Sequence, residues 1–381
     1  MYKIMPEYPE IYDEVYKIPD FIIEMSKEEV GVLSGLIRER APQKIVEIGV
    51  ASGGSTCLIL KCLENLGLTR TKLYSIDLNE KLWFDNTKET GWLLKNNIDK
   101  FSNCNNVNLL IGKYAVDRID EIGENVDFLF LDTVHHIPGE ILDFLLFLPH
   151  LSSNAVVVLH DTNLHNIHIF DKESICTRVL VNTVKAEKYY IPQKKYLNIG
   201  AFKITKDTKK YIEDVFASLL LPWFYQIDKE ILNKYKDEYK KYYSNIAINI
   251  WDNAVECEEK RFQMELEEIY LKEVKRLKKV FTSNKKVYIY GCGYRGKKLL
   301  KYIRANKYEI EGIIVSDGEF KEEYNNIGGE IYEYSKIKEK LDQSIILIAV
   351  ASQEVRNLLE KNVHNFVDIN GNFFELIESE R

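Results

Sequence analysis

Two segments of the sequence end in paired ionisable side chains. The apolar run Val126–Leu131 is followed by Asp132 and, three positions later, by His135, while a second apolar run ends in His160 and Asp161. Ligands of open α/β sheets bind outside the carboxyl ends of the parallel strands. If both runs are neighbouring parallel strands, the four side chains converge, as expected of a site for chemistry.

Carboxylates and imidazoles in one place can support acid–base catalysis. A neutral imidazole can accept the proton of a hydroxyl group, and a divalent cation held by carboxylates makes that hydroxyl a better nucleophile. Plainer explanations compete with this one. Asp132 could cap the helix that follows it, and His136 is better explained by packing or by the start of that helix. Asp132 and His135 are therefore the preferred functional residues.

A loop of small residues follows the apolar run Lys44–Ile48. Its letters, E-I-G-V-A-S-G-G-S-T, begin at Glu47 and include Gly49 and Gly53, which allow tight turns and the close approach of a ligand. The spacing E-x-G-x-x-x-G is not the G-x-G-x-x-G of dinucleotide folds. A carboxylate beside such a loop suits a cationic ligand better than a pyrophosphate. Ser55 could cap the next helix or contact the ligand.

The next apolar run, Leu73–Ile76, also ends in a carboxylate, Asp77. At that position in an adjacent βα unit, a carboxylate can accept hydrogen bonds from both hydroxyls of a ribose. The alternative is that the glycine loop is only a tight turn of some other nucleotide fold. Two acidic strand ends in this order favour the cofactor interpretation.

The loop and the two acidic strand ends resemble motif I and the following strand of class I S-adenosylmethionine-dependent methyltransferases. The resemblance implies a Rossmann-like, seven-stranded methyltransferase domain in which the loop backbone lies under the methionine part of the cofactor. Glu47 would then orient the amino or sulfonium end, Asp77 would bind the ribose, and Gly112 falls where the family contacts adenine. The cofactor-binding set that the resemblance implies is Glu47, Gly49, Ala51, Gly53, Ser55, Asp77 and Gly112.

The pattern D-x-x-H, followed by a strand ending in H-D, resembles sugar O-methyltransferases of bacterial glycan and natural-product pathways. That resemblance implies that Asp132 and Asp161 hold Mg²⁺ and that His135 is the general base. Those enzymes usually carry two consecutive acidic residues where this chain has His160 and Asp161. A metal set of Asp132, Asp161 and His160 would also suit manganese or zinc. A metal-free base, His135 oriented by Asp161, is the alternative.

Short β-branched runs alternate with helical periods from about residue 21 to 204, which predicts an α/β domain with a largely parallel sheet. Ser26 and Glu29 fit a capping box at the start of a helix that runs towards Arg40. The predicted strands are Lys44–Ile48, Leu73–Ile76, Val107–Ile111, Val126–Leu131 and Ala155–Leu159, with Thr177–Val184 and Gly200–Ile204 as a closing antiparallel pair.

The pattern changes twice along the chain and predicts three parts. These are a methyltransferase domain over 1–205, a helical connector over 206–283 and a second, smaller Rossmann-like α/β domain over 284–381. In the connector, apolar residues from Phe262 to Leu277 recur at three- and four-residue spacing, as on one face of a long helix. That face must be buried against the flanking domains or against the same helix of a second subunit. A homodimer through the connector is therefore one interpretation.

The C-terminal part contains an intact G-x-G-x-x-G. Gly291, Gly293 and Gly296 follow the predicted strand Val287–Tyr290, and Asp317 closes the next strand, where a ribose-binding acid would sit. This pattern predicts a second nucleotide site. Alternatively, the glycines are needed only for the close packing of strand and helix. Both interpretations stay open. No hydride-transfer constellation follows the motif.

The bulk composition limits the partners. A formal net charge of -7 disfavours nucleic acid. No signal peptide or membrane-spanning run is visible, and the scattered cysteines are expected to be reduced thiols of a cytoplasmic protein. The sequence therefore predicts a cytoplasmic S-adenosylmethionine-dependent O-methyltransferase acting on a sugar, a glycan precursor or another small molecule. The alternative is a nucleotide- or NAD-binding oxidoreductase or scaffold that acts through the C-terminal G-x-G-x-x-G domain.

Overall fold

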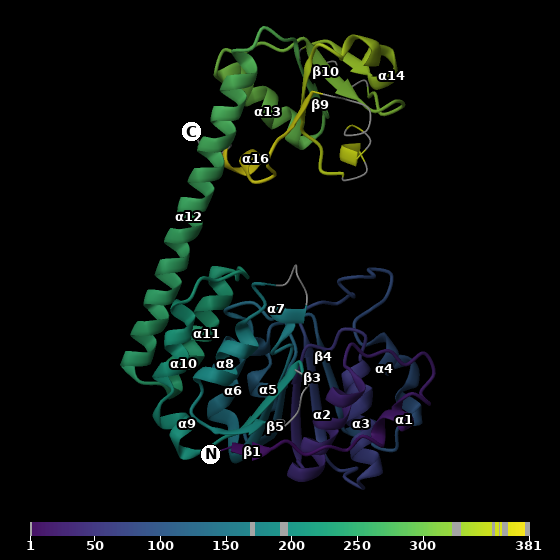
Figure 1. The fold of residues 1–381 in the computed structure, drawn as a ribbon, viewed down its shortest axis with the longest axis vertical. Coiled ribbons are helices and arrows are strands. Elements are labelled where there is room, and N and C mark those ends of the chain that lie inside the picture. Colours follow the sequence, from purple (N-terminus) through teal and green to yellow (C-terminus); the bar gives the residue numbers. More distant parts are fainter. Residues whose placement is uncertain are drawn as a thin grey trace. The chain divides into compact units, whose positions relative to one another are not determined.

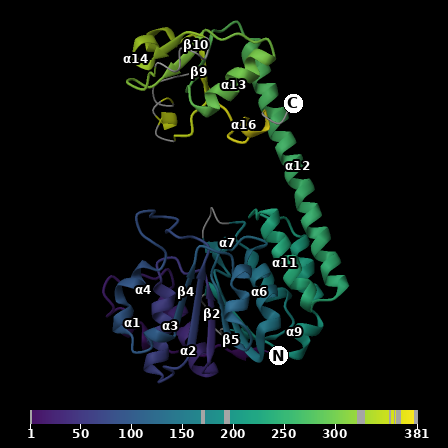
Figure 2. The same cartoon turned by 180° about the vertical axis from the view of Figure 1, so that it is seen from behind.

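The computed structural model divides the chain into two compact units, Met1–Glu258 and Glu259–Arg381. It describes residues 2–167, 172–190, 197–321, 329–352, 355–357, 359 and 365–377. Figures 1 and 2 show the elements of each unit from opposite sides. The predicted three-part division, with boundaries at 205/206 and 283/284, stays a prediction.

The first unit is built on an eight-stranded sheet of order β1-β7-β8-β6-β5-β2-β3-β4. β8 runs antiparallel to β6 and β7, and the other neighbours pair in parallel. The predicted α/β fold with a largely parallel sheet is thus confirmed, and β1 adds an eighth strand at the edge. The strands are β1 (Tyr2–Ile4), β2 (Lys44–Ile48), β3 (Lys72–Asp77), β4 (Val107–Ile111), β5 (Val126–Leu131), β6 (Leu151–His160), β7 (Glu187–Tyr190) and β8 (Ile199–Lys203).

One predicted strand is wrong. Thr177–Val184 falls on a helix, α8 (Cys176–Thr183), and the strand that pairs with β8 is β7. The β-branched residues of this segment suggest a strand, but Cys176 and Leu180 are both fully buried at the four-residue spacing of a helix face. Packing of α8 against α6 therefore outweighs the local β propensity.

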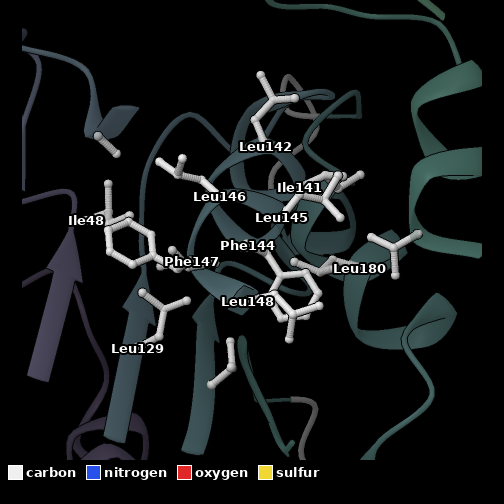
Figure 3. Close-up of a cluster of buried hydrophobic side chains, with 14 of the residues drawn as sticks. Ile48, Leu129, Ile141, Leu142, Phe144, Leu145, Leu146, Phe147, Leu148 and Leu180 are labelled. Atoms are coloured by element: carbon white, nitrogen blue, oxygen red, sulfur yellow. The ribbon is translucent and has the colours of Figure 1, made fainter. Parts of the chain in front are cut away.

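Helices cover both faces of this sheet. Along β2 and β5 successive side chains alternate between two buried clusters, as they must in a strand. One cluster is closed by α1, α2 and α3, and the other, shown in Figure 3, by α6 and α8. The helices of this part are α1 (Ile11–Val15), α2 (Lys27–Arg40), α3 (Gly54–Asn65), α4 (Trp92–Asn97), α5 (Ile119–Ile122), α6 (Gly139–Phe147) and α7 (Leu164–Ile167).

The predicted capping box at the start of α2 is confirmed. Ser26 Oγ accepts a hydrogen bond from the backbone N–H of Glu29 at 3.3 Å, and Glu29 Oε2 accepts one from the backbone N–H of Ser26 at 2.7 Å. Each bond satisfies a donor that the first turn of a helix leaves without a partner. Glu29 is thereby held in one position in the first turn of α2.

Residues 206–258 are helical, as predicted, and they pack into the core of the first unit. Tyr239 and Trp251 are 1% exposed and belong to the same apolar cluster as α6. The Tyr239 hydroxyl donates to the backbone oxygen of Leu142 in α6 at 2.9 Å. This segment comprises α9 (Lys206–Lys210), α10 (Glu213–Ala217), α11 (Lys229–Tyr242) and the first turns of α12 (Asn245–Phe281).

The second unit contains a five-stranded parallel sheet of order β11-β10-β9-β12-β13. A second α/β fold after the helical region was predicted and is confirmed. Its strands are β9 (Val287–Tyr290), β10 (Gly312–Val315), β11 (Ile331–Glu333), β12 (Ile345–Ile348) and β13 (Phe366–Asp368), and its helices include α13 (Tyr294–Ala305), α14 (Tyr334–Ile337) and α16 (Phe373–Leu376).

Within the described part of the chain, no helix combines the length and the apolar character needed to cross a membrane.

The packing of Trp251 gives a first prediction. Trp251→Ala is expected to lower the free energy of unfolding of the first unit by about 3–5 kcal/mol, because it leaves a large cavity in a closed core. Chemical denaturation followed by circular dichroism measures this. The control Met264→Ala, at a position that is 70% exposed, should change stability by less than about 0.5 kcal/mol. Equal, small effects of both variants would contradict the packing of this segment on the first unit.

Candidate active site

A cavity of about 650 Å³ lies at the carboxyl ends of β2, β3, β5 and β6. This is the edge of the sheet at which the sequence predicts a site. Of the predicted site residues in the first unit, Glu47, Gly53 and Gly112 are not among those that line the cavity. The ones that line it are Gly49, Ala51, Ser55, Asp77, Asp132, His135, His160 and Asp161.

The glycine loop after β2 needs glycine for a steric reason. Gly49 has a φ of 97°, and a Cβ at this position would lie 1.7 Å from the backbone oxygen of Asp132. A side chain here would push apart the loops that follow β2 and β5. Gly53 has a φ of 93°, which other residues rarely adopt. The glycines therefore let the backbone of the loop form the floor of the cavity.

Glu47 stabilises the glycine loop from the side away from the cavity. Its buried carboxylate accepts hydrogen bonds from the hydroxyls of Ser55 at 2.5 Å, Thr56 at 2.7 Å and Ser75 at 2.6 Å. Burial raises the pKa of Glu47 to about 7, and the three hydroxyl donors oppose that rise. The carboxylate faces the start of α3 and not the cavity. A direct contact between Glu47 and a cofactor stays a prediction.

Asp77 joins the end of β3 to the glycine loop. Its Oδ2 accepts hydrogen bonds from the backbone N–H groups of Val50 at 2.9 Å and Ala51 at 3.0 Å, and its Oδ1 accepts one from Asn79 at 2.8 Å. Asp77 thus fixes the loop and also lines the cavity. The role of its carboxylate toward ribose hydroxyls stays a prediction.

The acids and imidazoles after β5 and β6 meet in the cavity. His135 Nε2 lies 2.9 Å from Asp161 Oδ2 and 3.9 Å from Asp132 Oδ1. His160 Nδ1 lies 3.1 Å from Asp132 Oδ1. The structure therefore brings together the four side chains that the sequence places at two strand ends.

Two of these residues adopt a left-handed backbone conformation. His135 and Asp161 have φ values of 59° and 56°, a conformation that costs energy in residues other than glycine. Neighbours hold both in place. The His135 N–H donates to Glu140 Oε1 at 2.8 Å, and Asp161 accepts a hydrogen bond from the Asn198 side-chain amide. Thr177 Oγ1 donates to the backbone oxygen of Asp161 at 3.0 Å.

Both ring nitrogens of His135 face carboxylates. His135 Nδ1 lies 3.2 Å from Oε1 of Glu140, a fully buried residue of α6. Burial alone would lower the pKa of His135, but Asp161 and Glu140 raise it to about 10. Burial alone would raise the pKa of Glu140, but His135 lowers it to about 2. Both carboxylates thus favour the protonated form of His135.

His160 is enclosed in a similar way. Burial would lower its pKa, but Asp132, Asp161 and Glu29 raise it well above the usual value. His160 Nε2 lies 3.8 Å from Glu29 Oε2, on the opposite side of the ring from Asp132. Sequence analysis missed Glu29 and Glu140 as residues of the site. For Glu140 the only signal in the sequence was an acidic residue within an apolar helical run. Glu29 was explained by the capping box alone.

Three side chains are close enough to share a metal ion. Asp132, His135 and Asp161 each offer one ligand atom, and these atoms lie within 4.8 Å of one another. Two carboxylates and an imidazole suit a divalent cation. The predicted metal set contained His160 in place of His135. In the structure His160 interacts with the carboxylate of Asp132 and is outside this group.

Part of the cavity lining comes from the helical segment after residue 205. Tyr225, Ile227 and Tyr235 line the cavity together with Asp143 of α6. The Tyr235 hydroxyl donates to Asp143 Oδ1 at 2.9 Å. The sequence pattern of this segment, helical and without strands, gives no sign that its residues line the cavity.

The C-terminal glycine motif has a packing explanation. A Cβ at Gly296 would lie 1.9 Å from the backbone oxygen of Gly291, and one at Gly291 would lie 2.9 Å from that of Ala349. Gly293 has open space around it, and Asp317 accepts a hydrogen bond from the Ser335 N–H at 2.9 Å. None of these residues lines the cavity at the carboxyl edge of the first sheet. A nucleotide site here stays a prediction.

Comparison with known proteins agrees with the predicted family. A family model described as a methyltransferase domain matches residues 46–162, from β2 to the residue after Asp161. No curated protein matches the chain. The first unit thus contains a class I methyltransferase domain.

Several solved structures resemble half of the chain at low identity. The O-methyltransferase TomG from Streptomyces achromogenes, involved in tomaymycin synthesis and in complex with SAM, is 17% identical, with 53% of this chain and 92% of that chain covered and a TM-score of 0.36. A putative caffeoyl-CoA O-methyltransferase from Staphylococcus aureus is 15% identical (52% and 91% covered, TM-score 0.37). An O-methyltransferase from Bacillus cereus in complex with SAH is 16% identical (51% and 89% covered, TM-score 0.34).

Asp143 gives a prediction about pH. Burial raises its pKa to about 7, and the Tyr235 hydroxyl opposes that rise. The unfolded chain ionises Asp143 at a lower pH, so the folded state loses stability as pH rises towards 7. Asp143→Asn keeps the hydrogen bond from Tyr235 and removes this loss. The stability of Asp143→Asn relative to the parent should increase by up to about 3 kcal/mol between pH 5 and pH 8, since one pKa unit is about 1.4 kcal/mol.

Urea denaturation at the two pH values measures the Asp143 effect. Asp99→Asn, at an exposed position, serves as the control and should change stability equally at both pH values. A parent–variant difference for Asp143→Asn that does not change with pH would contradict the raised pKa.

Proposed function

We propose that the first unit transfers the methyl group of S-adenosylmethionine to a hydroxyl oxygen of a sugar or glycan precursor. One observation carries this proposal. The glycine loop after β2 and the cluster of Asp132, His135 and Asp161 line the same cavity. A cofactor on the loop and an acceptor at the cluster would therefore be within one enclosed space.

The charge of the cavity supports a cationic methyl donor. Glu24 and Asp77 line it together with the two aspartates of the cluster, and these four carboxylates outnumber the cationic groups of Lys113, His135 and His160. Carboxylates of one sign in a concave site attract the opposite charge. The sulfonium and ammonium groups of S-adenosylmethionine carry positive charge, so this cavity favours the cofactor over an anionic ligand.

The outer wall supports an acceptor with both hydroxyl groups and apolar faces. Tyr114, Tyr225 and Tyr235 contribute aromatic faces and phenolic hydroxyls to the cavity. Such side chains combine apolar contact area with a polar tip. A sugar ring matches this mixture, which is the reason for preferring a sugar or glycan precursor.

Removal of the acceptor's proton falls to His135. Asp161 and Glu140 favour the protonated form of the imidazole, so His135 can take the acceptor's proton only after its own proton has passed to solvent. The base is then the neutral imidazole of His135, which Asp161 orients. The second carboxylate, Asp132, lies on the same side of the ring and helps to place the acceptor oxygen.

A divalent cation fits the donor set. Asp132 and Asp161 would hold it, and it would bind the acceptor oxygen and lower the pKa of the hydroxyl group. The metal-free form of the mechanism uses the same residues, with Asp161 orienting His135 and accepting part of its charge.

Binding of the cofactor tests the first half of the proposal. Asp77→Asn is expected to weaken the binding of S-adenosylmethionine by at least about tenfold, because a charged acceptor for ribose hydroxyls is lost. Isothermal titration calorimetry measures the dissociation constant. Asp99→Asn should bind like the parent. No binding of S-adenosylmethionine to the folded parent protein would refute the proposed activity.

Turnover tests the second half. His135→Gln is expected to lower kcat by about 10²–10⁴, the usual effect of removing a general base, and to leave the dissociation constant for S-adenosylmethionine within about threefold. Formation of S-adenosylhomocysteine is measured with a panel of monosaccharides and nucleotide sugars, and with catechol as a non-sugar acceptor. Full activity of His135→Gln would exclude it as the base. Methylation of catechol alone would exclude the sugar class.

The metal is tested on the same assay. If a cation is required, EDTA abolishes turnover, Mg²⁺ or Mn²⁺ restores it, and Asp161→Asn needs a higher metal concentration than the parent. Unchanged turnover in EDTA, together with inactive His135→Gln, selects the metal-free base.

A further inference from the structure

The second unit has a cavity of its own, of about 370 Å³. One wall is the part of α12 from Ile269 to Arg276, and the other is the loop that follows β13, including Asn370 and Gly371. The cavity is thus at the carboxyl end of an edge strand of the parallel sheet. In open α/β sheets this is the end at which ligands bind.

The lining of this cavity is strongly charged. Lys272, Arg276 and Arg356 bring three cations, and Glu273 and Asp368 bring two carboxylates. Lys272 and Arg276 are four residues apart on α12 and so share one face of the helix. Arg356 approaches from the other wall.

Each carboxylate is already paired with an arginine. Arg276 Nη1 donates to Glu273 Oε1 at 2.5 Å, and Arg356 Nη1 donates to Asp368 Oδ2 at 2.9 Å. Lys272 is then left without a counter-ion among the described residues, and the cavity has a net positive charge. Arg276 uses one guanidinium nitrogen for its hydrogen bonds within the described part of the chain, so its other N–H groups can bind a ligand.

Hydrogen bonds fix the positions of the two guanidinium groups. Arg356 donates from Nε and Nη2 to the backbone oxygen of Val350, at 3.3 Å and 3.0 Å. Arg276 also donates to the backbone oxygen of Asp368 at 3.2 Å. These bonds tie α12 to the carboxyl end of β13 and Arg356 to the residues that follow β12. The two guanidinium groups therefore do not have to be ordered when a ligand binds.

Glu273 gives independent support for a binding role. Its side chain is 97% buried in the cavity wall (3% exposed), yet its Oε2 has no hydrogen-bond partner among the described residues. Asp368 Oδ1 is also buried without one. Unpaired buried oxygens reduce stability, so this cluster is explained better as the wall of a ligand site than as packing between two walls. Both oxygens are hydrogen-bond acceptors, so they repel a phosphate and can contact only donor groups of the ligand, such as its hydroxyls.

We propose that this cavity binds the phosphate group of a small phosphorylated ligand. Guanidinium and ammonium groups from two walls can contact several oxygens of a tetrahedral phosphate, whereas a planar carboxylate offers two. The phosphate could belong to a sugar phosphate, to a nucleotide or to free inorganic phosphate. None of the residues Gly291, Gly293 and Gly296 lines the cavity, so the site is distinct from the G-x-G-x-x-G motif.

The full-length protein is titrated by calorimetry at low ionic strength with inorganic phosphate, glucose 1-phosphate and AMP, and with glucose as the uncharged control. Probes that carry phosphate should bind and glucose should not. The ranking of the three phosphate probes separates a sugar phosphate, a nucleotide and free phosphate as the source of the group.

Two substitutions locate the site. Lys272→Gln and Arg276→Gln should each weaken the binding of the best phosphate probe by at least about fivefold, and the double variant should abolish it. Lys272 makes no hydrogen bond or ion pair within the described residues, so its replacement leaves the fold intact. The matched control Lys275→Gln, an exposed neighbour on α12 that does not line the cavity, should bind like the parent.

The expected pattern is loss of binding in the two cavity variants with unchanged binding of S-adenosylmethionine, and with unchanged thermal unfolding in Lys272→Gln, which breaks no interaction among the described residues. Failure of all three phosphate probes to bind the parent would overturn the proposal. Binding of a phosphate probe to the double variant would also overturn it. If the probe that still binds is AMP, the binding site would instead be the glycine motif. Because S-adenosylmethionine binds the first unit under the proposed function, the two proposals fail separately.

Discussion

Alternating buried charges at the carboxyl edge of the first sheet hold the candidate active site together. Each buried imidazole lies between carboxylates from different elements, because a buried charge is costly unless it is paired. One set joins the loop after β6 to α6, and the other joins the loop after β5 to α2. These helices cover opposite faces of the sheet, so the charges tie both layers to the site. The sets are His135 with Asp161 and Glu140, and His160 with Asp132 and Glu29.

The same interactions explain why the site can keep a strained backbone. His135 and Asp161 adopt left-handed conformations that their side chains disfavour. Hydrogen bonds from Glu140, Asn198 and Thr177 hold these two turns. The glycine loop after β2 follows another constraint, since Gly49 lies against the backbone of Asp132. The glycine loop after β2 and the charged cluster are therefore packed directly against each other.

The helical segment over 206–258 belongs to this arrangement as well. Its aromatic residues Tyr239 and Trp251 are buried against α6, and Tyr235 reaches Asp143 beside the cavity. Residues outside the matched methyltransferase region therefore shape the wall that an acceptor would meet. In this fold the specificity for an acceptor depends on such additions more than on the common sheet.

The sequence by itself determined the parallel strands, the capping box of α2 and the strand ends that carry Asp77, Asp132 and Asp161, because burial on both faces and local hydrogen bonds leave a pattern in neighbouring residues. It failed at Thr177–Val184, where packing outweighs propensity. Only the tertiary structure decided that Glu140 pairs with His135, that Glu47 turns away from the cavity and that Tyr235 closes it. Each of these depends on contacts between elements far apart in the chain, and a single sequence carries no signal of such contacts.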